Sequence, residues 1–339
     1  MLAVRIDRYG PAESLNVLDV PIPKPGPHDV LVRVQATGVN RLDLLLREGK
    51  VFQVPLPRIP GTDLAGGIVA VGSEVASRRV GECVFAAPIL SCGQCTHCLQ
   101  GEDNLCQQFG TLGSTIDGGY AEYVRIPARN AVPLPKGMDW VLGASFALTY
   151  AAAAAMLRRG RLVAGETVLV LGANGGLGYA AVELARALGG RVIAVNRTPE
   201  RSDALLRIGA SAVIEPGPTM VQAVRELTGG KGVDLVFEHV GATTLEQSVA
   251  SLAMDGRLVL GGVTTGTQAP LDLKAVFTKR LEILGCRGSG RKDLDRVLGL
   301  VSSGAVRPHV QKVLSLEQAV QAHQLLELGH VLGKVVLAM

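Results

Sequence analysis

The sequence predicts an α/β chain, in which a doubly wound parallel sheet is combined with a second, mostly-β domain. From Gly143 onward, apolar strand-like runs alternate with helical segments, which is typical of a parallel sheet covered by helices on both faces. Residues 1–134 lack this alternation and show short apolar runs broken by glycine and proline, which favours a compact antiparallel, barrel-like domain. With 339 residues, the chain is long enough for two domains of roughly 150 residues each.

Composition and charge argue against several other classes of protein. Apolar residues make up 47% of the chain and charged residues 19%, as in a globular protein with a large core. The formal net charge of +4 is spread without a basic stripe, so we expect no nucleic-acid partner. Residues 1–10 lack a signal-peptide core, and the longest apolar stretch, Ala144–Leu157, contains Ser145 and Thr149. We therefore expect a cytoplasmic protein without a membrane segment.

The first 134 residues contain two turns with polar side chains. Pro21–Pro27 holds four prolines and must be a loop. Asn40 and Asp43 follow a strand and enter a short helix, and Pro60–Asp63 starts another turn. Composition alone gives Asn40 and Asp43 no role beyond helix capping. The strands expected here are 17–20, 30–36, 66–71 and 120–126.

Four cysteines have the spacing of a metal site. Cys92, Cys95 and Cys98 are followed by Cys106 after seven intervening residues. Four thiolates suit a tetrahedral zinc ion and leave no open position, so such a site is structural. An iron–sulfur cluster also uses four thiolates, but its usual spacings differ. His97 is expected to be an exposed spectator, and Cys83 and Cys286 lie in apolar runs that favour the core.

A glycine-rich turn lies at the start of the alternating region. The apolar run Val168–Leu171 leads into this turn, an Ala/Leu-rich helical pattern follows to Leu188, and a second apolar run covers Val192–Val195. In this context the glycines let the chain turn sharply and approach a pyrophosphate, and the helix amides hold the phosphates. A purely structural βα turn is the alternative. The expected dinucleotide contacts in the turn are Gly172, Asn174, Gly175, Gly176, Leu177 and Gly178.

The remaining alternation predicts a six-stranded parallel sheet and a C-terminal addition. Strands are expected at 168–171, 192–195, 212–214, 233–237, 257–261 and 281–285, with helices at 144–157, 176–188, 199–208, 219–228 and 243–254. Residues 313–337 predict strand, helix (316–328) and strand, which we expect to return to the first domain because six strands complete the sheet. His239 ends the fourth strand on the edge where ligands bind, so it is either a cofactor contact or a satisfied strand-end histidine. Gly262 and Val263 follow the fifth strand and are also expected to contact the cofactor.

The residues after the second strand indicate which nicotinamide cofactor is used. An NAD site usually has Asp or Glu there, which binds the ribose 2′-hydroxyl, but this chain has Asn196. Arg197 and Arg201 are four residues apart, so both could bind a 2′-phosphate. Glu200, which is acidic, argues against a phosphate site here. The alternative interpretation is that both arginines are solvated surface charges. The sequence therefore predicts NADPH over NADH.

The assembled motifs resemble the medium-chain dehydrogenase/reductase superfamily over essentially the whole chain. The matching pieces are LNVLDVPIPKPGPHDVLVRVQATGVN, PGTDLAGGIVAVG, SCGQCTHCLQGEDNLC, DGGYAEYV and the glycine turn. The resemblance implies a GroES-like catalytic domain (1–148 and 289–339, with a zinc lobe at about 88–110) and a Rossmann domain (149–288). It also implies a cofactor in the cleft between them and assembly as a homodimer or homotetramer.

Departures from the family pattern concern the catalytic zinc. Zinc alcohol dehydrogenases of this superfamily hold a second zinc through residues at the positions of Asn40, Thr62 and Leu148. Asn, Thr and Leu do not form a usual zinc site. The pattern Gly-Val-Asn-x-x-Asp resembles the zinc-independent quinone oxidoreductase branch, which includes enoyl and alkenal reductases. The chain therefore resembles a hybrid, with the structural zinc kept and the catalytic zinc lost.

Loss of the catalytic zinc changes the reaction that the resemblance implies. Without a Lewis acid, the easier hydride acceptors are quinones and α,β-unsaturated carbonyls, because they delocalise the incoming charge onto oxygen. The candidate catalytic residues are Asn40, Asp43 and Thr62, with Tyr150 as a possible proton donor unless it is a core residue and water supplies the proton. Two alternatives stay open: an alcohol dehydrogenase with an unconventional metal held through Asp63, and a non-catalytic NADPH-binding or redox-sensing protein.

Overall fold

The structure is a computed structural model that describes all residues from Met1 to Met339. The chain folds into two compact units. The first unit comprises Met1–Thr149, Ser289–Ser302 and Pro308–Met339, and the second comprises Tyr150–Gly288 and Ser303–Arg307. None of the helices is both long and apolar enough to cross a membrane.

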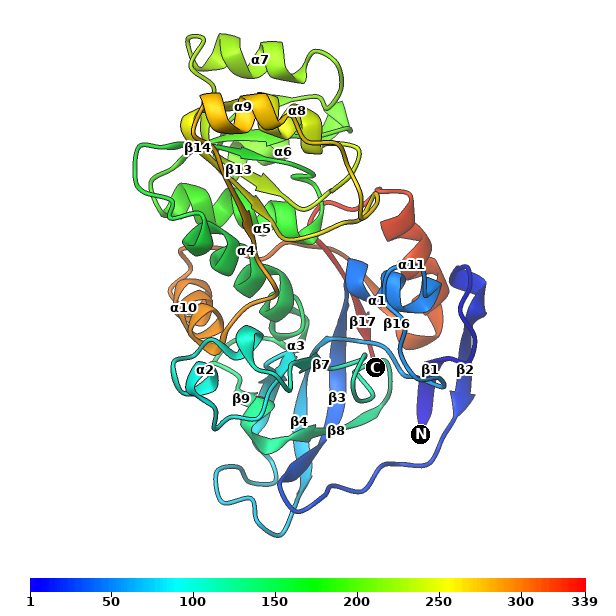
Figure 1. The fold of residues 1–339 in the computed structure, drawn as a ribbon. Coiled ribbons are helices and arrows are strands. Elements are labelled where there is room, and N and C mark those ends of the chain that lie inside the picture. Colours follow the sequence, from blue (N-terminus) through cyan, green and yellow to red (C-terminus); the bar gives the residue numbers. More distant parts are fainter. The chain divides into compact units, whose positions relative to one another are not determined.

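The first unit is built on a seven-stranded sheet. Its order is β16-β17-β3-β4-β5-β9, and β8 pairs with β3 beside this path. All neighbours are antiparallel except β16 and β17, and Figure 1 shows β3, β4 and β8 as its central arrows. The strands of this unit are β1 (Leu2–Ile6), β2 (Leu15–Asp19), β3 (Asp29–Val39), β4 (Asp63–Val71), β5 (Cys83–Ala86), β6 (Ile89–Leu90), β7 (Gly110–Thr111), β8 (Tyr123–Pro127), β9 (Ala131–Pro133), β16 (Val310–Ser315) and β17 (Lys334–Ala338).

Two buried apolar clusters support this sheet. One gathers Val32, Ile68 and Val124 from β3, β4 and β8, and the other joins β1, β17 and α11 around Leu337. The predicted C-terminal strand, helix and strand are β16, α11 and β17, and β17 pairs with β3. The helices of this unit are α1 (Arg41–Glu48), α2 (Thr96–Leu99), α3 (Trp140–Gly143), α10 (Arg291–Ser302) and α11 (Ala319–Glu327).

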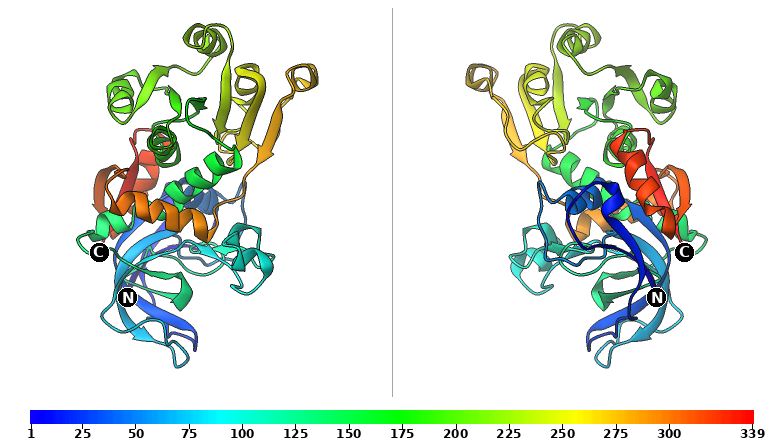
Figure 2. Two further views of the ribbon diagram at one scale, coloured as in Figure 1. Left: turned by 90° about the vertical axis from the view of Figure 1, so that its left-hand side faces the viewer. Right: turned by 90° about the vertical axis from the view of Figure 1, so that its right-hand side faces the viewer.

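The second unit is the predicted six-stranded parallel sheet. Its order is β12-β11-β10-β13-β14-β15, so the strand order reverses between β10 and β13, where ligands of doubly wound sheets bind. Figure 2 shows β15, in orange, at one edge. The strands are β10 (Thr167–Val170), β11 (Arg191–Val195), β12 (Ala210–Ile214), β13 (Val233–Glu238), β14 (Leu252–Leu260) and β15 (Glu282–Gly285). The helices are α5 (Gly176–Ala187), α6 (Ser202–Arg207), α7 (Met220–Leu227), α8 (Leu245–Ala250) and α9 (Leu273–Thr278), while α4 (Ala147–Arg159) begins in the first unit.

Two sequence predictions about local structure were wrong. The helix expected over 243–254 ends at Ala250, because Leu252 is buried and pairs with Val233 as the first residue of β14. Cys83 is exposed rather than in the core, and Cys286 is half-buried. Alternation along β5 turns Cys83 away from buried Val84, and its strand partner is a glycine, Gly67, that has no side chain to cover it.

Candidate functional site

The four predicted cysteines converge in a small lobe of the first unit. The sulfur atoms of Cys92, Cys95, Cys98 and Cys106 all lie within 4.8 Å of one another. No other group of three or more His, Cys, Asp or Glu side chains brings its ligand atoms together in this way. Backbone N–H groups point at the sulfurs: Cys95 donates to Cys92 Sγ at 3.4 Å and Gln108 donates to Cys106 Sγ at 3.3 Å. Backbone donors from Gln94 and Cys95 lower the pKa of Cys92 to about 6. A backbone hydrogen bond from Cys98 lowers the pKa of Cys95, but burial and the neighbouring thiols together raise it to about 11. The convergence of four sulfur atoms, rather than these values, makes the cluster suited to zinc, which binds cysteines as thiolates.

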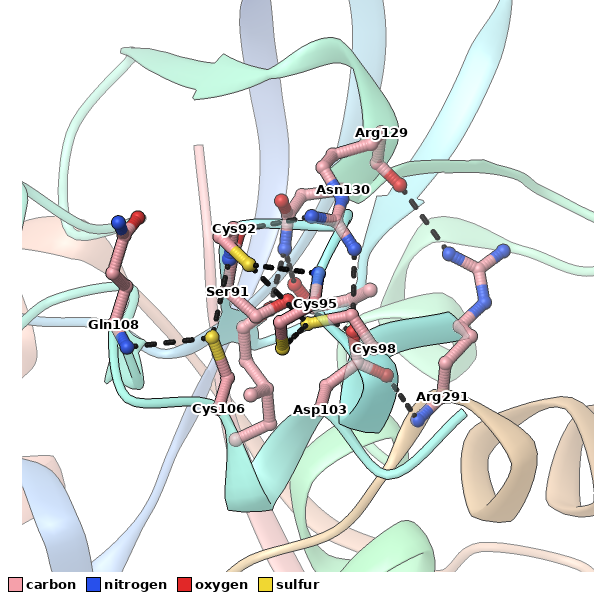
Figure 3. A network of polar contacts seen from close by, with 12 residues as sticks. Ser91, Cys92, Cys95, Cys98, Asp103, Cys106, Gln108, Arg129, Asn130 and Arg291 are labelled. Carbon is pink, nitrogen blue, oxygen red and sulfur yellow. Dashed lines mark hydrogen bonds and ion pairs between the residues drawn. The ribbon is translucent and has the colours of Figure 1, made fainter. Parts of the chain in front are cut away.

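A buried carboxylate supports the lobe from below. Asp103 accepts hydrogen bonds from Ser91 Oγ at 2.8 Å, from the Arg129 guanidinium at 3.2 Å and from the Arg291 backbone N–H at 2.8 Å (Figure 3). Arg291 opens α10, so Asp103 ties the chain between the third and fourth cysteines to that helix. His97, by contrast, is exposed on α2, as predicted. The lobe is thus a folded element with its own anchors, as a structural metal site requires.

The predicted polar residues of the two turns meet at the start of α1. Asn40 caps this helix, and its backbone N–H donates to Asp43 Oδ2 at 2.8 Å. The other carboxylate oxygen of Asp43 accepts from the Gly61 N–H at 3.1 Å and from the Thr62 hydroxyl at 3.4 Å. Asp43 is completely buried, and burial raises its pKa to about 6. The capping role that composition allowed is therefore real, and the same carboxylate also fixes the second turn.

A buried ion pair lies beside these residues. Lys334, the first residue of β17, lies 3.1 Å from Asp63 Oδ2 with its ammonium nitrogen, and it also donates to the side-chain oxygen of Asn40. Asp63 further accepts from the Asn40 amide at 3.0 Å and from the Leu148 N–H at 2.8 Å. Lys334 and Asp63 are 3% and 0% exposed as side chains. The Asp63 carboxylate is therefore fully bonded within the protein, with a cation already against it.

This arrangement bears on the roles predicted for Asn40 and Thr62. One amide N–H of Asn40 points to Asp63, and the other makes only a 3.5 Å contact with the Gly38 carbonyl. The Thr62 hydroxyl donates to Asp43. Their function as hydrogen-bond donors to a substrate stays a prediction. To serve in this way, each side chain would have to replace one of its hydrogen bonds within the protein by a hydrogen bond to the substrate. Sequence reasoning missed Lys334; the signal was a lone lysine opening an otherwise apolar strand.

The glycine turn has the shape expected for a dinucleotide site. Gly172 has a φ of +57°, and a Cβ on Gly178 would lie 2.3 Å from the Gly172 carbonyl oxygen. Gly175 caps α5, and Gly176 begins this helix with Leu177 and Gly178 in its first turn. Only glycine fits at Gly172 and Gly178 without strain or collision. The cap residue Gly175 is exposed and Gly176 and Leu177 are half-buried, and the first amides of a helix lack intrahelical partners, so this helix start is suited to bind an anion.

Two asparagines connect this turn to the end of β11. Asn196 exchanges hydrogen bonds with the Thr198 backbone, through its Nδ2 at 2.6 Å and its Oδ1 at 2.9 Å. These backbone partners fix its orientation, so Asn174 donates its Nδ2 to Asn196 Oδ1 at 2.5 Å. The Asn174 oxygen is then a buried acceptor without a partner in the protein. A ligand hydroxyl or amide would satisfy this oxygen, so the pair fits a nucleotide site.

The other predicted cofactor residues surround the same end of the sheet or follow β11. The ring of His239 lies over Gly172, and its Nε2 is 2.8 Å from the Leu171 carbonyl oxygen. A Cβ on Gly262 would lie 2.5 Å from the His239 carbonyl oxygen, and Val263 is half-buried in the same loop. Arg197 is exposed, whereas Arg201 is half-buried. Burial lowers the pKa of Arg201 from its ordinary value, an effect that Glu200 opposes.

Tyr150, the candidate proton donor, has an internal partner. Its hydroxyl donates to Glu183 Oε2 at 2.5 Å, and the residue is 1% exposed. Burial, and then the charge of Glu183, raise the pKa of Tyr150 well above its ordinary value. Glu183 also accepts from the Arg307 backbone N–H at 3.2 Å. These contacts match the core role that was left open for Tyr150, and its role as a proton donor stays a prediction.

Comparisons with known proteins agree on one family. The family model described as "Alcohol dehydrogenase GroES-like domain" matches residues 26–136, and "Zinc-binding dehydrogenase" matches residues 176–303. The chain is 33% identical to an NAD-dependent alcohol dehydrogenase of Sulfolobus acidocaldarius, with 99% of each chain covered. It is 31% identical to a quinone oxidoreductase of Lama guanicoe, with 99% of this chain and 97% of the relative covered.

Solved structures show the same relationship. A crystal structure of an NAD-dependent alcohol dehydrogenase matches with a TM-score of 0.95 and 38% identity over all of both chains. The predicted combination of a GroES-like and a Rossmann fold is thus confirmed. The chain belongs to the medium-chain dehydrogenase/reductase superfamily and is an oxidoreductase of the NAD(P)H-dependent type.

Proposed function

We propose that the protein is an NADPH-dependent reductase of quinones or α,β-unsaturated carbonyls that works without a catalytic zinc. The observation that carries the proposal is the Asp63–Lys334 pair. Both oxygens of the Asp63 carboxylate, which bonds the Asn40 amide, accept hydrogen bonds inside the protein, and an ammonium group lies against it. A metal cation at Asp63 would have to displace Lys334 and would leave that lysine buried and unpaired.

The cofactor supplies the hydride. We propose that Asn40 and Thr62 contact the acceptor oxygen, on which negative charge develops, and that water supplies the proton. The 3.5 Å contact from Asn40 to the Gly38 carbonyl is the weakest of its bonds, so this N–H turns to a substrate at the lowest cost. Asp43 holds both residues in place through the Asn40 backbone and the Thr62 hydroxyl.

The four cysteines are proposed to hold one structural zinc. Such a site is closed and contributes to folding rather than to hydride transfer. The catalytic domain is proposed to comprise 1–148 and 289–339, with the zinc lobe at about 88–110, and the Rossmann domain to comprise 149–288. A homodimeric or homotetrameric state and a cytoplasmic location remain predictions from the sequence.

NADPH is the proposed cofactor because the residue directly after β11 is not a carboxylate. Asn196 stands at the position usual for a ribose-binding acid, and the exposed Arg197 comes next. Arg197→Ala should raise the Kd for NADPH about tenfold, the equivalent of one charge-assisted contact, and should change the Kd for NADH little. Arg191→Ala is a matched control, because Arg191 is also exposed but begins the same strand at its opposite end. Equal losses for both cofactors in Arg197→Ala, or a wild-type preference for NADH, would contradict the assignment.

A substrate screen tests the function itself. Quinones, enals, enones and simple alcohols are offered with each cofactor, the alcohols with its oxidised form. We expect turnover with conjugated acceptors and NADPH, and little with simple alcohols. An alcohol dehydrogenase is the second candidate, because an alcohol dehydrogenase is 33% identical over the whole chain. Metal-dependent alcohol oxidation would favour that candidate, and cofactor binding without any turnover would favour a non-catalytic protein.

A further inference from the structure

A row of buried polar side chains leads away from Asp43 within the first unit. Tyr120 and His323 are both 0% exposed, and the Tyr120 hydroxyl lies 3.2 Å from His323 Nε2. His323 Nδ1 lies 3.3 Å from the guanidinium of Arg47, which is 1% exposed. Arg47 in turn pairs with Glu327 at 2.5 Å, and Glu327 is one-third exposed. The row therefore connects the buried carboxylate to the end of α11 at the surface.

The direction of each hydrogen bond follows from chemistry. A guanidinium only donates, so His323 Nδ1 accepts from Arg47 and its proton lies on Nε2. That Nε2–H donates to the Tyr120 oxygen, which leaves the Tyr120 hydroxyl proton for its other partner, Asp43. Burial and the charge of Asp43 raise the pKa of Tyr120 well above its ordinary value, so the phenol keeps this proton. The two bonds that join Arg47, His323 and Tyr120 thus both donate in the direction of Tyr120, whose pKa is raised by burial and by the charge of Asp43.

The row orients groups and does not conduct protons. Arg47, which links His323 to the surface residue Glu327, stays protonated at any working pH. Burial, followed by the charges of Arg47 and Arg41, lowers the pKa of His323 to about 3, so the ring stays neutral. The Tyr120 hydroxyl is therefore a donor of fixed orientation. It holds the Asp43 carboxylate as an acceptor for the Gly61 N–H and the Thr62 hydroxyl.

Tyr120 also packs directly against the second turn. Its backbone N–H donates to the Pro60 carbonyl at 3.0 Å. Gly61 has a φ of +106°, and a Cβ there would lie 2.5 Å from Tyr120 Cδ1. The ring and the hydroxyl of one residue thus contact the turn and its carboxylate together. The ring of His323 meets the Tyr120 ring edge-on, with centroids 5.8 Å apart.

We propose that Tyr120 and His323 are positioning residues of the hydride-transfer site, which act through Asp43 to fix the Thr62 hydroxyl and the Gly61 backbone. The inference rests on the function proposed above. Other charged groups that face Asp43 are Lys334, which favours its ionised form, and Asp63, which opposes it. Those two groups are unchanged by substitutions at Tyr120 or His323, so the row can be tested separately from them.

The test compares the pH dependence of kcat in matched variants. With NADPH and 1,4-benzoquinone or 2-cyclohexenone, wild-type kcat should fall as the pH drops through about 6, where Asp43 takes up a proton. Tyr120→Phe keeps the ring but removes the donor, which should move this fall upward by about one pH unit. His323→Leu should move it in the same direction, and His323→Gln, which retains a side-chain N–H, should restore it.

The control is Tyr9→Phe, since the Tyr9 hydroxyl bonds to the backbone of Val54 at 2.6 and 2.8 Å. This variant should leave the pH of the fall unchanged. The proposal would be overturned if kcat fell at the same pH in Tyr120→Phe and His323→Leu as in wild type, even if kcat were lower at every pH. A purely structural role would lower kcat without changing the pH at which it falls.

A second measurement separates this inference from the proposed function. The Asp43 carboxyl is titrated by NMR in protein labelled with ¹³C at the aspartate side chains, and its signal is assigned with Asp43→Asn. A higher midpoint in Tyr120→Phe supports the positioning role even if no acceptor is turned over, in which case only the proposed function fails. An unchanged midpoint overturns the positioning role whatever the enzyme reduces.

Discussion

Two polar clusters of the first unit are built from opposite kinds of side chain. The cysteine cluster brings together four sulfur atoms within 4.8 Å, and all of them become acceptors when deprotonated. The cluster around Asp63 brings together a carboxylate, an amide and an ammonium group, which satisfy one another at 3.0–3.1 Å. The first cluster needs a cation from outside, whereas the second already contains one in Lys334.

The comparison supports the proposal that this chain keeps one metal site and has lost another. Asn40 and Thr62 are not usual zinc ligands, and without Lys334 the buried charge of Asp63 would have only the neutral donors of Asn40 and Leu148. Lys334 provides a charged partner from β17, a strand nearly three hundred residues away in sequence. We therefore expect the position that resembles a catalytic metal site to be stable without a metal.

The largest expected effect comes from removing a ligand of the cysteine cluster. Cys106 is the buried member of the four, so Cys106→Ser should abolish zinc retention and lower the free energy of unfolding by on the order of 5 kcal/mol. Zinc content by mass spectrometry and urea unfolding measure both effects. Cys83→Ser is the matched control, because Cys83 is exposed on β5 and lies outside the cluster. Normal stability in Cys106→Ser after full loss of zinc would mean that the lobe does not need its metal.

Breaking the buried ion pair should have the next largest effect. Lys334→Met leaves the Asp63 charge buried with only neutral donors, which should cost about 3–5 kcal/mol. Asp63→Asn combined with Lys334→Met should recover much of that loss, because no charge is then left unpaired. Arg280→Met breaks an exposed pair with Asp255 and should cost less than about 1 kcal/mol. Similar unfolding free energies for Lys334→Met and Arg280→Met would remove the distinction between the two clusters.

The smallest expected effect is a pH dependence from His323. Its pKa is about 3 in the folded protein against an ordinary value of 6.5, so between these values the unfolded chain binds more protons and stability falls with acidification. Lowering the pH from 7 to 5 should cost about 2 kcal/mol through this group. Asp43 has the opposite effect on stability. Because its pKa is raised to about 6, the folded protein binds this proton at a higher pH than the unfolded chain and gains stability on acidification.

Comparison with His323→Leu measures the contribution of the histidine. The difference in unfolding free energy between wild type and His323→Leu should shrink by at least about 2 kcal/mol from pH 7 to pH 5, because a higher pKa of Asp43 in the variant would act in the same direction. A difference that is the same at both pH values would show that His323 is not held neutral in the folded protein.

Patterns within short stretches could be read from the sequence, and pairings between distant stretches could not. Strand and helix periodicity predicted the six strands from β10 to β15, and cysteine spacing predicted the lobe, because each signal lies within a few turns of chain. Lys334 and His323 escaped notice, since their importance comes from partners 271 and 276 residues away. The hydrogen-bond partners of Asn40 and Asp43 likewise lie in distant stretches, at Lys334 and at Gly61 and Thr62, and no local pattern pairs them.

Metal content and activity, measured on the same purified protein, test the central claim most directly. The account predicts about one zinc per chain, bound by Cys92, Cys95, Cys98 and Cys106. It also predicts that NADPH-dependent reduction of a quinone or enone continues under mild chelation as long as the fold persists. Two zinc ions per chain, with activity lost on gentle chelation while the fold persists, would contradict it and would place a catalytic metal beside Asp63.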